Sequence, residues 1–185
     1  MDIEIAIILG TTRPKRKSVH AARLIEEVGR EFDGLNTTFV DPRDYDLSND
    51  GNDEENKIPE YTEIVRRVDG FFIVTPEYNR AFPGSLKSLL DKELKEYIHK
   101  PVAFAGVSSG MTGGARAIES LIAPVREMGM VPTFAEVFFP KVQDTFDDDG
   151  NLLDEAQRER VRKAYAELIW MTRVLKYGRE NIEQN

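Results

Sequence analysis

Runs of apolar residues alternate with amphipathic segments along the whole chain. Continuous apolar runs bounded by turn residues are typical of strands that are buried on both faces of a parallel sheet. Five such runs occur, at residues 3–9, 35–40, 71–74, 102–107 and 131–139. Apolar residues recur at helical spacing in residues 18–32, 59–69, 115–128 and 152–176 and in the segment that begins at Pro83. The alternation predicts an α/β domain of three layers, in which helices cover a parallel sheet.

Several residues mark where the predicted helices begin or bend. Ser18 can cap the first helix with its hydroxyl group, and Pro59 and Pro83 suit the first turns of the second and third. Pro124 lies inside the fourth helix and is expected to kink it. Residues 41–57 are rich in Asp, Asn, Ser and Gly, which predicts a surface loop after the second strand.

Composition is that of a soluble globular protein. The 185 residues are 41% hydrophobic and 31% charged, and no linker or repeat divides them, so we expect one domain spanning residues 1–185. The formal net charge of −8 disfavours nucleic acid and anionic membranes as partners. The sequence shows neither a signal peptide nor an apolar segment long enough to cross a bilayer. Together with the lack of cysteine, this favours a cytoplasmic location.

The loops that follow the first, third and fourth predicted strands are where we expect chemistry. In open parallel sheets, ligands bind beyond the carboxyl ends of the strands. The three loops are GTTRPKRKS at residues 10–18, TPEYNRAFPGSLKSLLD at residues 75–91 and SSGMTGGAR at residues 108–116.

The first loop concentrates positive charge in an acidic protein. It contains four cationic side chains and leads into a helix, whose first turn offers free N–H groups and the positive end of the helix dipole. Thr11, Thr12 and Ser18 add hydroxyl donors, and the Arg13 guanidinium suits a phosphate. The glycine spacing matches neither a Walker loop nor the dinucleotide fingerprint. The loop predicts an anion site, with a solvated basic turn as the alternative.

The second loop offers a wall that is both polar and aromatic. Glu77, Tyr78 and Asn79 follow Pro76 and combine hydrogen-bonding groups with one aromatic face. This combination suits a flat heteroaromatic ring with polar edges. The alternative is a rigid turn, in which Asn79 serves the backbone and Tyr78 packs against its surroundings.

The third loop is rich in small residues. Ser108, Gly110, Gly113 and Gly114 allow a ligand to approach the backbone closely, so peptide N–H groups can bind the edge of a ring. A flexible linker between strand and helix is the alternative. A ligand with a phosphate at one end and a flat polar ring at the other fits all three loops, and flavin mononucleotide (FMN) is such a molecule.

The same three stretches, in this order, resemble the NADPH-dependent FMN reductase family, a flavodoxin-like group that includes quinone, chromate and azo-dye reductases. The resemblance extends from residue 3 to residue 175, and PEYNRAFPGSLKSLLD is its most specific stretch. It implies a three-layer flavodoxin-like fold with a five-stranded parallel sheet in the order 2-1-3-4-5. It also implies a homodimer or homotetramer, with the helices that begin at Pro83 and Ala115 at the subunit boundary.

The resemblance implies a role for each cofactor-binding residue. Thr11 stands where the family commonly has serine, and both residues supply a hydroxyl group. The residues implied to hold the FMN phosphate are Thr11, Arg13 and Ser18. Those implied to line the ribityl chain and ring are Pro76, Glu77, Tyr78 and Asn79. Those implied to border the isoalloxazine are Ser108, Gly110, Gly113 and Gly114.

The implied activity is FMN-dependent NAD(P)H oxidoreduction. Hydride would pass from NADPH or NADH to the flavin and then to a quinone, free flavin, azo compound or metal acceptor in a ping-pong cycle. Flavin N5 would carry the chemistry without a catalytic side chain, and N–H groups of residues 108–114 would stabilise charge near N1.

Two other functions stay open. The first is a non-enzymatic flavodoxin-type electron carrier. It is disfavoured because Tyr78 alone places an aromatic ring at the site, whereas Trp170 lies in the last helix. The second is a cofactor-free binding module of the same fold. No metal site is predicted, because the acidic run at residues 147–150 fails the calcium-loop pattern at both ends.

Overall fold

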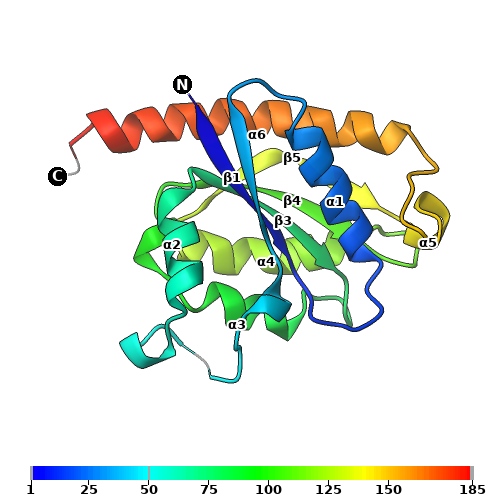
Figure 1. The fold of residues 1–185 in the computed structure, drawn as a ribbon, viewed down its shortest axis with the longest axis horizontal. Helices are drawn as coiled ribbons and strands as arrows, with labels where there is room; N and C mark the ends of the chain where they lie inside the picture. The colour runs from blue at the N-terminus through cyan, green and yellow to red at the C-terminus, as the bar shows by residue number, and fades with distance from the viewer. Residues whose placement is uncertain (1, 50, 184–185) are drawn as a thin grey trace.

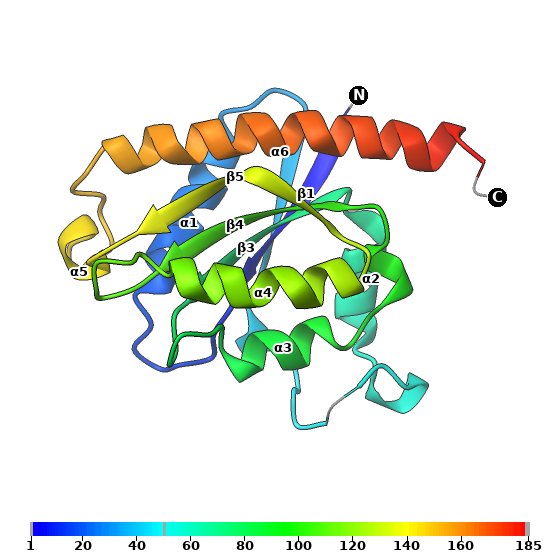
Figure 2. The same ribbon diagram turned by 180° about the vertical axis from the view of Figure 1, so that it is seen from behind.

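The structure, a computed structural model, describes residues 2–49 and 51–183. These residues form a parallel sheet of five strands in the order β2-β1-β3-β4-β5, with helices on both faces (Figures 1 and 2). The predicted three-layer fold and strand order are confirmed. Among the described residues, no helix is both long enough and apolar enough to cross a membrane.

The strands follow the apolar runs of the sequence. They are β1 (Ile3–Leu9), β2 (Leu35–Val40), β3 (Gly70–Pro76), β4 (Pro101–Val107) and β5 (Val131–Phe139). The central strands β1, β3 and β4 are buried almost throughout, whereas the edge strands β2 and β5 mix buried with partly exposed positions. Helices cover both faces of the centre, so a continuous apolar run is what a central strand needs.

Two layers of helices enclose the sheet. The helices are α1 (Ser18–Gly29), α2 (Pro59–Arg67), α3 (Gly84–Leu90), α4 (Ala115–Glu127), the short α5 (Val142–Thr145) and α6 (Ala156–Asn181). Helices α1 and α6 pack on one face of the sheet, and α2, α3 and α4 pack on the other. Single 3₁₀ turns lie at η1 (Pro42–Asp44), η2 (Glu54–Asn56) and η3 (Lys95–Tyr97).

Some helix boundaries differ from the prediction. The first helix ends at Gly29 instead of residue 32, and the last begins at Ala156 instead of residue 152 and continues to Asn181. The last helix starts late because Phe146 and Leu152 pair in a turn before it. The predicted capping role of Ser18 is wrong: Ser18 is the first helical residue, and no side-chain hydrogen bond caps α1.

Candidate functional site

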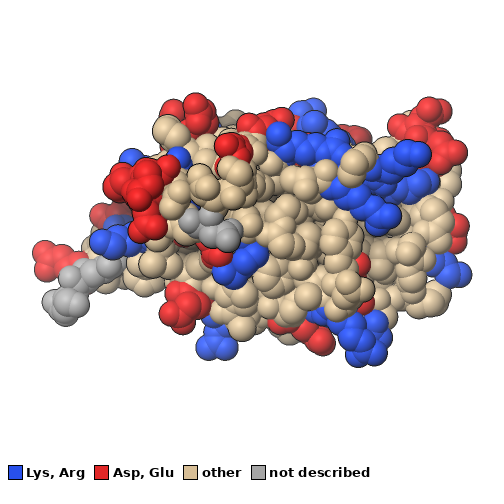
Figure 3. All heavy atoms as spheres, turned by 90° about the horizontal axis from the view of Figure 1, so that it is seen from below, with Lys and Arg blue, Asp and Glu red and all other residues tan. Residues whose placement is uncertain are grey.

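The loops after β1, β3 and β4 meet at one edge of the sheet. The three strands are parallel neighbours, so their carboxyl ends lie together. Figure 3, seen from below, shows the largest group of basic side chains at the upper right, with an uncharged centre and separate acidic and basic groups around the edge. Two adjoining cavities of about 600 Å³ and 390 Å³ open at these loops. We call them the larger and the smaller rim cavity.

Most of the predicted site residues line these cavities. Arg13, Glu77 and Tyr78 line both, so they lie between them. The other residues of the larger rim cavity are Thr11, Thr12, Asn79, Pro83, Gly84 and Ser85. The others of the smaller rim cavity are Lys15, Arg16, Lys17, Ser18, Pro76, Val107, Ser108, Ser109, Val142 and Gln143. Gly110, Gly113 and Gly114 are the predicted site residues that line neither cavity.

Side-chain and backbone hydrogen bonds hold the first loop against the second. The Gly10 N–H donates to the Val74 carbonyl at 2.8 Å and so extends the pairing of β1 with β3. The buried Thr11 hydroxyl lies 2.8 Å from the Tyr78 hydroxyl and accepts a hydrogen bond from the Arg13 N–H at 3.2 Å. Thr11 therefore ties the first loop to Tyr78, which lies between the two cavities.

Ser18 contributes a buried hydroxyl group without a hydrogen-bond partner among the described residues, beside the smaller rim cavity. Its relative exposure is 3%, and its Oγ has no hydrogen-bond partner in the described part of the chain. Buried polar atoms are nearly always paired, and leaving one unpaired costs free energy. Because Ser18 lines the smaller rim cavity in the first turn of α1, an anion bound there would supply the missing partner.

The cationic cluster of the first loop divides into two kinds of side chain. Arg16 forms a nearly buried ion pair with Asp41, and Lys17 lies 3.1 Å from the exposed Asp148. Within the described ranges, the side chains of Arg13 and Lys15 form no ion pair or hydrogen bond. Arg13 and Lys15 are therefore the cations of this loop that remain available to an anion.

The second loop makes a tight turn at its tip. Tyr78 and Ala81 exchange backbone hydrogen bonds of 2.8 and 3.0 Å around Asn79 and Arg80. Both turn residues have positive φ, 50° and 69°, as a two-residue hairpin turn requires. The rigid-turn interpretation therefore describes the Asn79 backbone, and Asn79 still lines the larger rim cavity.

Glu77 connects the second loop to the third. Its carboxylate accepts a hydrogen bond from the Thr112 hydroxyl at 3.2 Å and another from the Arg116 guanidinium at 3.2 Å. Its N–H donates to the Val107 carbonyl at 3.1 Å. Glu77 thus holds two loops together, and Thr112 and Arg116 are site residues that the sequence analysis missed.

The glycines of the third loop serve different purposes. Gly113 and Gly114 have φ of 61° and 86°. A Cβ on Gly114 would lie 2.4 Å from the Val107 nitrogen, and one on Gly113 would lie 2.9 Å from Phe138. A Cβ on Gly110 would meet nothing within 4 Å. Close packing on β4 and β5 therefore requires glycine at residues 113 and 114, whereas Gly110 is free of such packing.

The segment after β5 holds the carbonyl groups of the third loop. The Ser108 carbonyl accepts from the Val142 N–H at 3.0 Å, and the Gly110 carbonyl accepts from the Lys141 N–H at 2.9 Å. The Gln143 amide donates to the Ser109 carbonyl at 3.3 Å. In a planar trans peptide the N–H points away from the carbonyl. The N–H groups of residues 109–111 consequently point away from the segment after β5.

In the acidic run at residues 147–150, the Asp147 carboxylate accepts hydrogen bonds from residues close to it in sequence. The Asp147 carboxylate accepts from the N–H groups of Asp149 and Asn151 at 3.0 and 2.8 Å and from the Asn151 amide at 2.8 Å. These bonds lower the pKa of Asp147, those from Asn151 most of all. Among the described residues there is no His, Cys, Asp or Glu cluster that could hold a metal ion.

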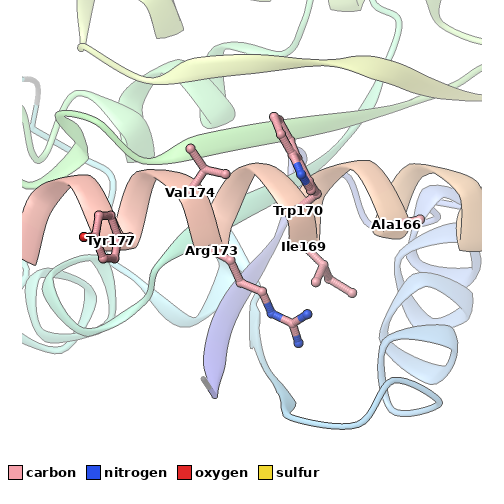
Figure 4. A pocket seen from close by; sticks show the side chains of 6 residues that line it. All are labelled: Ala166, Ile169, Trp170, Arg173, Val174 and Tyr177. Atoms are coloured by element: carbon pink, nitrogen blue, oxygen red, sulfur yellow. The ribbon is translucent and has the colours of Figure 1, made fainter.

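A third hollow, of about 490 Å³, lies on the outer surface of α6. Figure 4 shows that every labelled side chain around it comes from α6, with Trp170 and Val174 on one side and Ile169 and Arg173 on the other. Its lining is mostly apolar, and Arg173 is its one charged residue among those described. No loop from the carboxyl ends of the strands contributes to it, so we assign the site to the two rim cavities.

Comparisons with known proteins show the family to which this chain belongs. Residues 3–144 match the family described as NADPH-dependent FMN reductase. The chain is 29% identical to an NAD(P)H-dependent FMN reductase of Pseudomonas aeruginosa over 182 residues, which cover 94% of this chain and 97% of the relative. It is also 29% identical to a quinone reductase of Pseudomonas putida, over 83% of this chain and 86% of the relative.

A solved structure confirms the fold. FerB, a flavoenzyme NAD(P)H:(acceptor) oxidoreductase from Paracoccus denitrificans, superposes with a TM-score of 0.75 at 21% identity. The superposition covers 92% of this chain and 98% of FerB. Since the family match spans well over half of the chain, the protein belongs to the NADPH-dependent FMN reductase family and is an oxidoreductase that uses FMN and NAD(P)H.

Proposed function

We propose that this protein binds FMN across the rim cavities and transfers reducing equivalents from NAD(P)H to a small acceptor. The proposed acceptor is a quinone, free flavin, azo compound or metal ion, and the proposed cycle is ping-pong. The bound FMN would supply the redox-active ring, which accepts hydride from nicotinamide and passes electrons to the acceptor. The residues of this chain would bind and orient the cofactor.

One observation carries the proposal: the buried Ser18 hydroxyl lacks a partner at the edge of the smaller rim cavity. Arg13 and Lys15 line the same cavity, and the first turn of α1 adds the positive end of a helix dipole. This combination of donors fits a phosphate group. We therefore propose that Ser18, Arg13 and the first loop, including Thr11, hold the phosphate of FMN.

The other two loops fit the ribityl chain and ring. Pro76, Glu77 and Tyr78 line the smaller rim cavity next to Ser108. The N–H groups of residues 109–111 point away from the scaffold that binds their carbonyls, so they can donate to the ring and stabilise negative charge there. Asn79 lines the larger rim cavity, which adjoins the smaller one at Tyr78.

An enzyme is favoured over an electron carrier by the shortage of aromatic side chains. Tyr78 is the one aromatic residue, among those described, that lines either rim cavity. Trp170 lies on α6, outside both. A flavin bound here would keep an open face, which nicotinamide needs in order to stack on it.

Purification followed by spectroscopy and turnover tests the proposal. The protein should bind FMN with absorbance in the flavin region and should oxidise NADPH or NADH in steady state when a quinone is added. Flavin binding without turnover would identify an electron carrier. A protein that binds no FMN at micromolar concentration would be a cofactor-free module, and the proposal would fail.

We also propose that the chain forms a homodimer or homotetramer through α3 and α4. Exposed apolar side chains follow α3 or precede α4, namely Leu94 at 43%, Ile98 at 41% and Met111 at 74% exposure. Sedimentation should give a mass at least twice that of one chain, and replacing Leu94 and Ile98 with serine should lower it. If the mass stays unchanged after both substitutions, the subunit boundary does not lie at α3 and α4.

A further inference from the structure

Three charged residues hold the backbone of the first loop. We call Arg16, Asp41 and Arg43 the bracket. Arg16 donates to the Thr11 carbonyl at 2.7 Å and binds both oxygens of the Asp41 carboxylate, one of them at 2.9 Å. The side chain of Arg16 is only 7% exposed, so this pair is largely removed from water. Asp41, the first residue after β2, is thereby tied to the loop that follows β1.

Asp41 also places the second arginine of the bracket. Its carboxylate accepts a hydrogen bond from the Arg43 N–H at 3.0 Å and so caps the η1 turn. The Arg43 guanidinium then reaches the same loop as Arg16. It donates to the Thr12 carbonyl at 3.1 Å and to the Arg13 carbonyl.

The bracket therefore binds three consecutive carbonyl groups, those of Thr11, Thr12 and Arg13. Carbonyl oxygens repel a phosphate, whereas N–H groups attract it. In planar trans peptides, the Thr12 and Arg13 N–H groups must lie opposite the first two of these carbonyls. The Arg13 N–H donates to the Thr11 hydroxyl, which is hydrogen-bonded to the hydroxyl of Tyr78 between the two cavities.

We propose that Asp41 and Arg43, together with Arg16, are positioning residues for the phosphate of FMN. Asp41 and Arg43 line neither rim cavity, and Arg16, which lines the smaller one, is engaged with Asp41 and the Thr11 carbonyl. The three residues fix the peptide groups of the first loop with carbonyls outward and donors toward the rim cavities, so that the loop is organised before the phosphate arrives. This inference rests on the proposed function, because it concerns the same site.

Arg43 offers the cleanest test because it is exposed and its replacement leaves no buried charge behind. The probes are FMN and riboflavin, which differ by the phosphate group, titrated into flavin-free protein by quenching of flavin fluorescence. Arg43→Met should weaken FMN binding about tenfold, the expected size for losing charge-assisted hydrogen bonds, and should leave riboflavin binding unchanged. A loss of general stability would weaken both flavins equally, so the ratio of the two affinities reports positioning.

Two further variants separate geometry from charge. Arg43→Lys keeps the positive charge and loses the planar fork that reaches two carbonyls, so its FMN affinity should lie clearly below wild type. If Arg43→Lys binds FMN as tightly as wild type, charge alone acts and the positioning role is wrong. Arg66→Met is the matched control. Arg66 is an exposed arginine of α2 that pairs with Glu96 of the η3 turn and lines neither rim cavity, so the variant should bind both flavins as wild type does.

Asp41→Asn tests the bracket from its other end. It should lower the FMN-to-riboflavin affinity ratio in the same direction as Arg43→Met, provided that circular dichroism shows a folded protein. If that variant does not fold, Arg43→Met alone decides. If wild type prefers FMN to riboflavin but Arg43→Met shows the same ratio, the bracket inference is overturned. If wild type does not prefer FMN at all, the proposed function fails instead.

Discussion

The rim of the sheet and the outer face of α6 are both hollowed, but they differ in chemistry. At the rim, polar groups from three loops converge, and one of them, the Ser18 hydroxyl, is buried without a partner in the described chain. On α6, the hollow is lined by one helix and is mostly apolar, and Trp170, Val174 and Tyr177 are 60%, 46% and 57% exposed. Hollow size alone would not distinguish the two. Convergence of unpaired polar groups marks a site for a small polar ligand, whereas exposed apolar groups on one element do not.

The charged residues of α6 reinforce this difference. Arg158 and Arg162 bind Glu27 of α1 and Glu31, which follows that helix, with distances between 2.8 and 3.0 Å. These arginines are occupied in holding two helices side by side on one face of the sheet. Arg13 and Lys15 at the rim have no such partners among the described residues, and they stay available to an incoming anion.

The largest effect is expected where the rim depends on backbone packing. Gly114→Val should lower the free energy of unfolding by about 3 kcal/mol or more, because the new side chain would meet the β4 backbone in a region of positive φ. Gly110→Ala should change it by less than about 0.5 kcal/mol, since nothing surrounds that position. Urea unfolding measures both. Equal effects would mean that the third loop is not held as described.

The next largest effect is expected on FMN affinity, from the loss of the Ser18 hydroxyl. Ser18→Ala removes the unpaired hydroxyl and should weaken FMN binding about tenfold, which is about 1.4 kcal/mol. The flavin-free variant should unfold at the same or slightly higher free energy, because no protein hydrogen bond is lost. Isothermal titration and thermal unfolding give the two values. If the substitution leaves FMN affinity unchanged, the phosphate lies elsewhere.

Glu93 has an unpaired buried atom like that of Ser18 but lies away from the rim cavities. Comparing the two shows whether such an atom is enough to mark a ligand site. The Glu93 Oε2 also lacks a hydrogen-bond partner, but it lies 3.6 Å from the Lys57 ammonium and lines neither rim cavity. Burial raises the pKa of Glu93, and Glu96 raises it further, against the hydrogen bond from Thr62. We therefore expect this atom to affect stability and not FMN binding.

The pH dependence of that effect has a definite sign. With a raised pKa in the folded state, Glu93 binds its proton more tightly when folded. Its contribution to stability is therefore largest at low pH, and it is lost as the pH rises through the pKa that Glu93 has in the folded state. Glu93→Gln mimics the protonated form, so it should raise the Tm relative to wild type at about pH 8 and not at about pH 4. A Tm gain that does not depend on pH would contradict this account.

The smallest effect is expected on α6. Trp170→Lys should change the free energy of unfolding by less than about 0.5 kcal/mol, because the side chain is 60% exposed. FMN affinity and the sedimentation mass should equal those of wild type, since the proposed subunit boundary lies at α3 and α4. A lower mass for this variant would show that the apolar face of α6 is an interface between subunits.

Much of the fold could be predicted because its signals are local. The apolar runs of β1 and β4 match their strands residue for residue, except that β4 begins one residue earlier, at Pro101. Helix ends were less predictable, because the start of α6 depends on a turn that pairs Phe146 with Leu152. Nothing in the spacing of apolar residues reports that pairing.

The location of the candidate site could be predicted from the sequence, but the contacts between its side chains could not. Sequence alone determined that loops rich in residue types that suit a phosphate and a flat ring follow three of the strands. It also supplied the side chains, such as Ser18 and Tyr78, whose types suit FMN. These properties depend on residue identity and order along the chain, which a sequence contains in full.

The tertiary structure decided which of these side chains are available. Arg16 belongs to the cationic cluster of the first loop, but Asp41, 25 residues away, pairs with it. Arg43 lies in what reads as a surface loop, and it binds carbonyls 30 and 31 residues away. Gly113 and Gly114 read as room for a ligand, but they are required by packing on β4 and β5. Free energies of pairing and packing depend on distances between segments that are remote in sequence, and only the folded chain sets those distances.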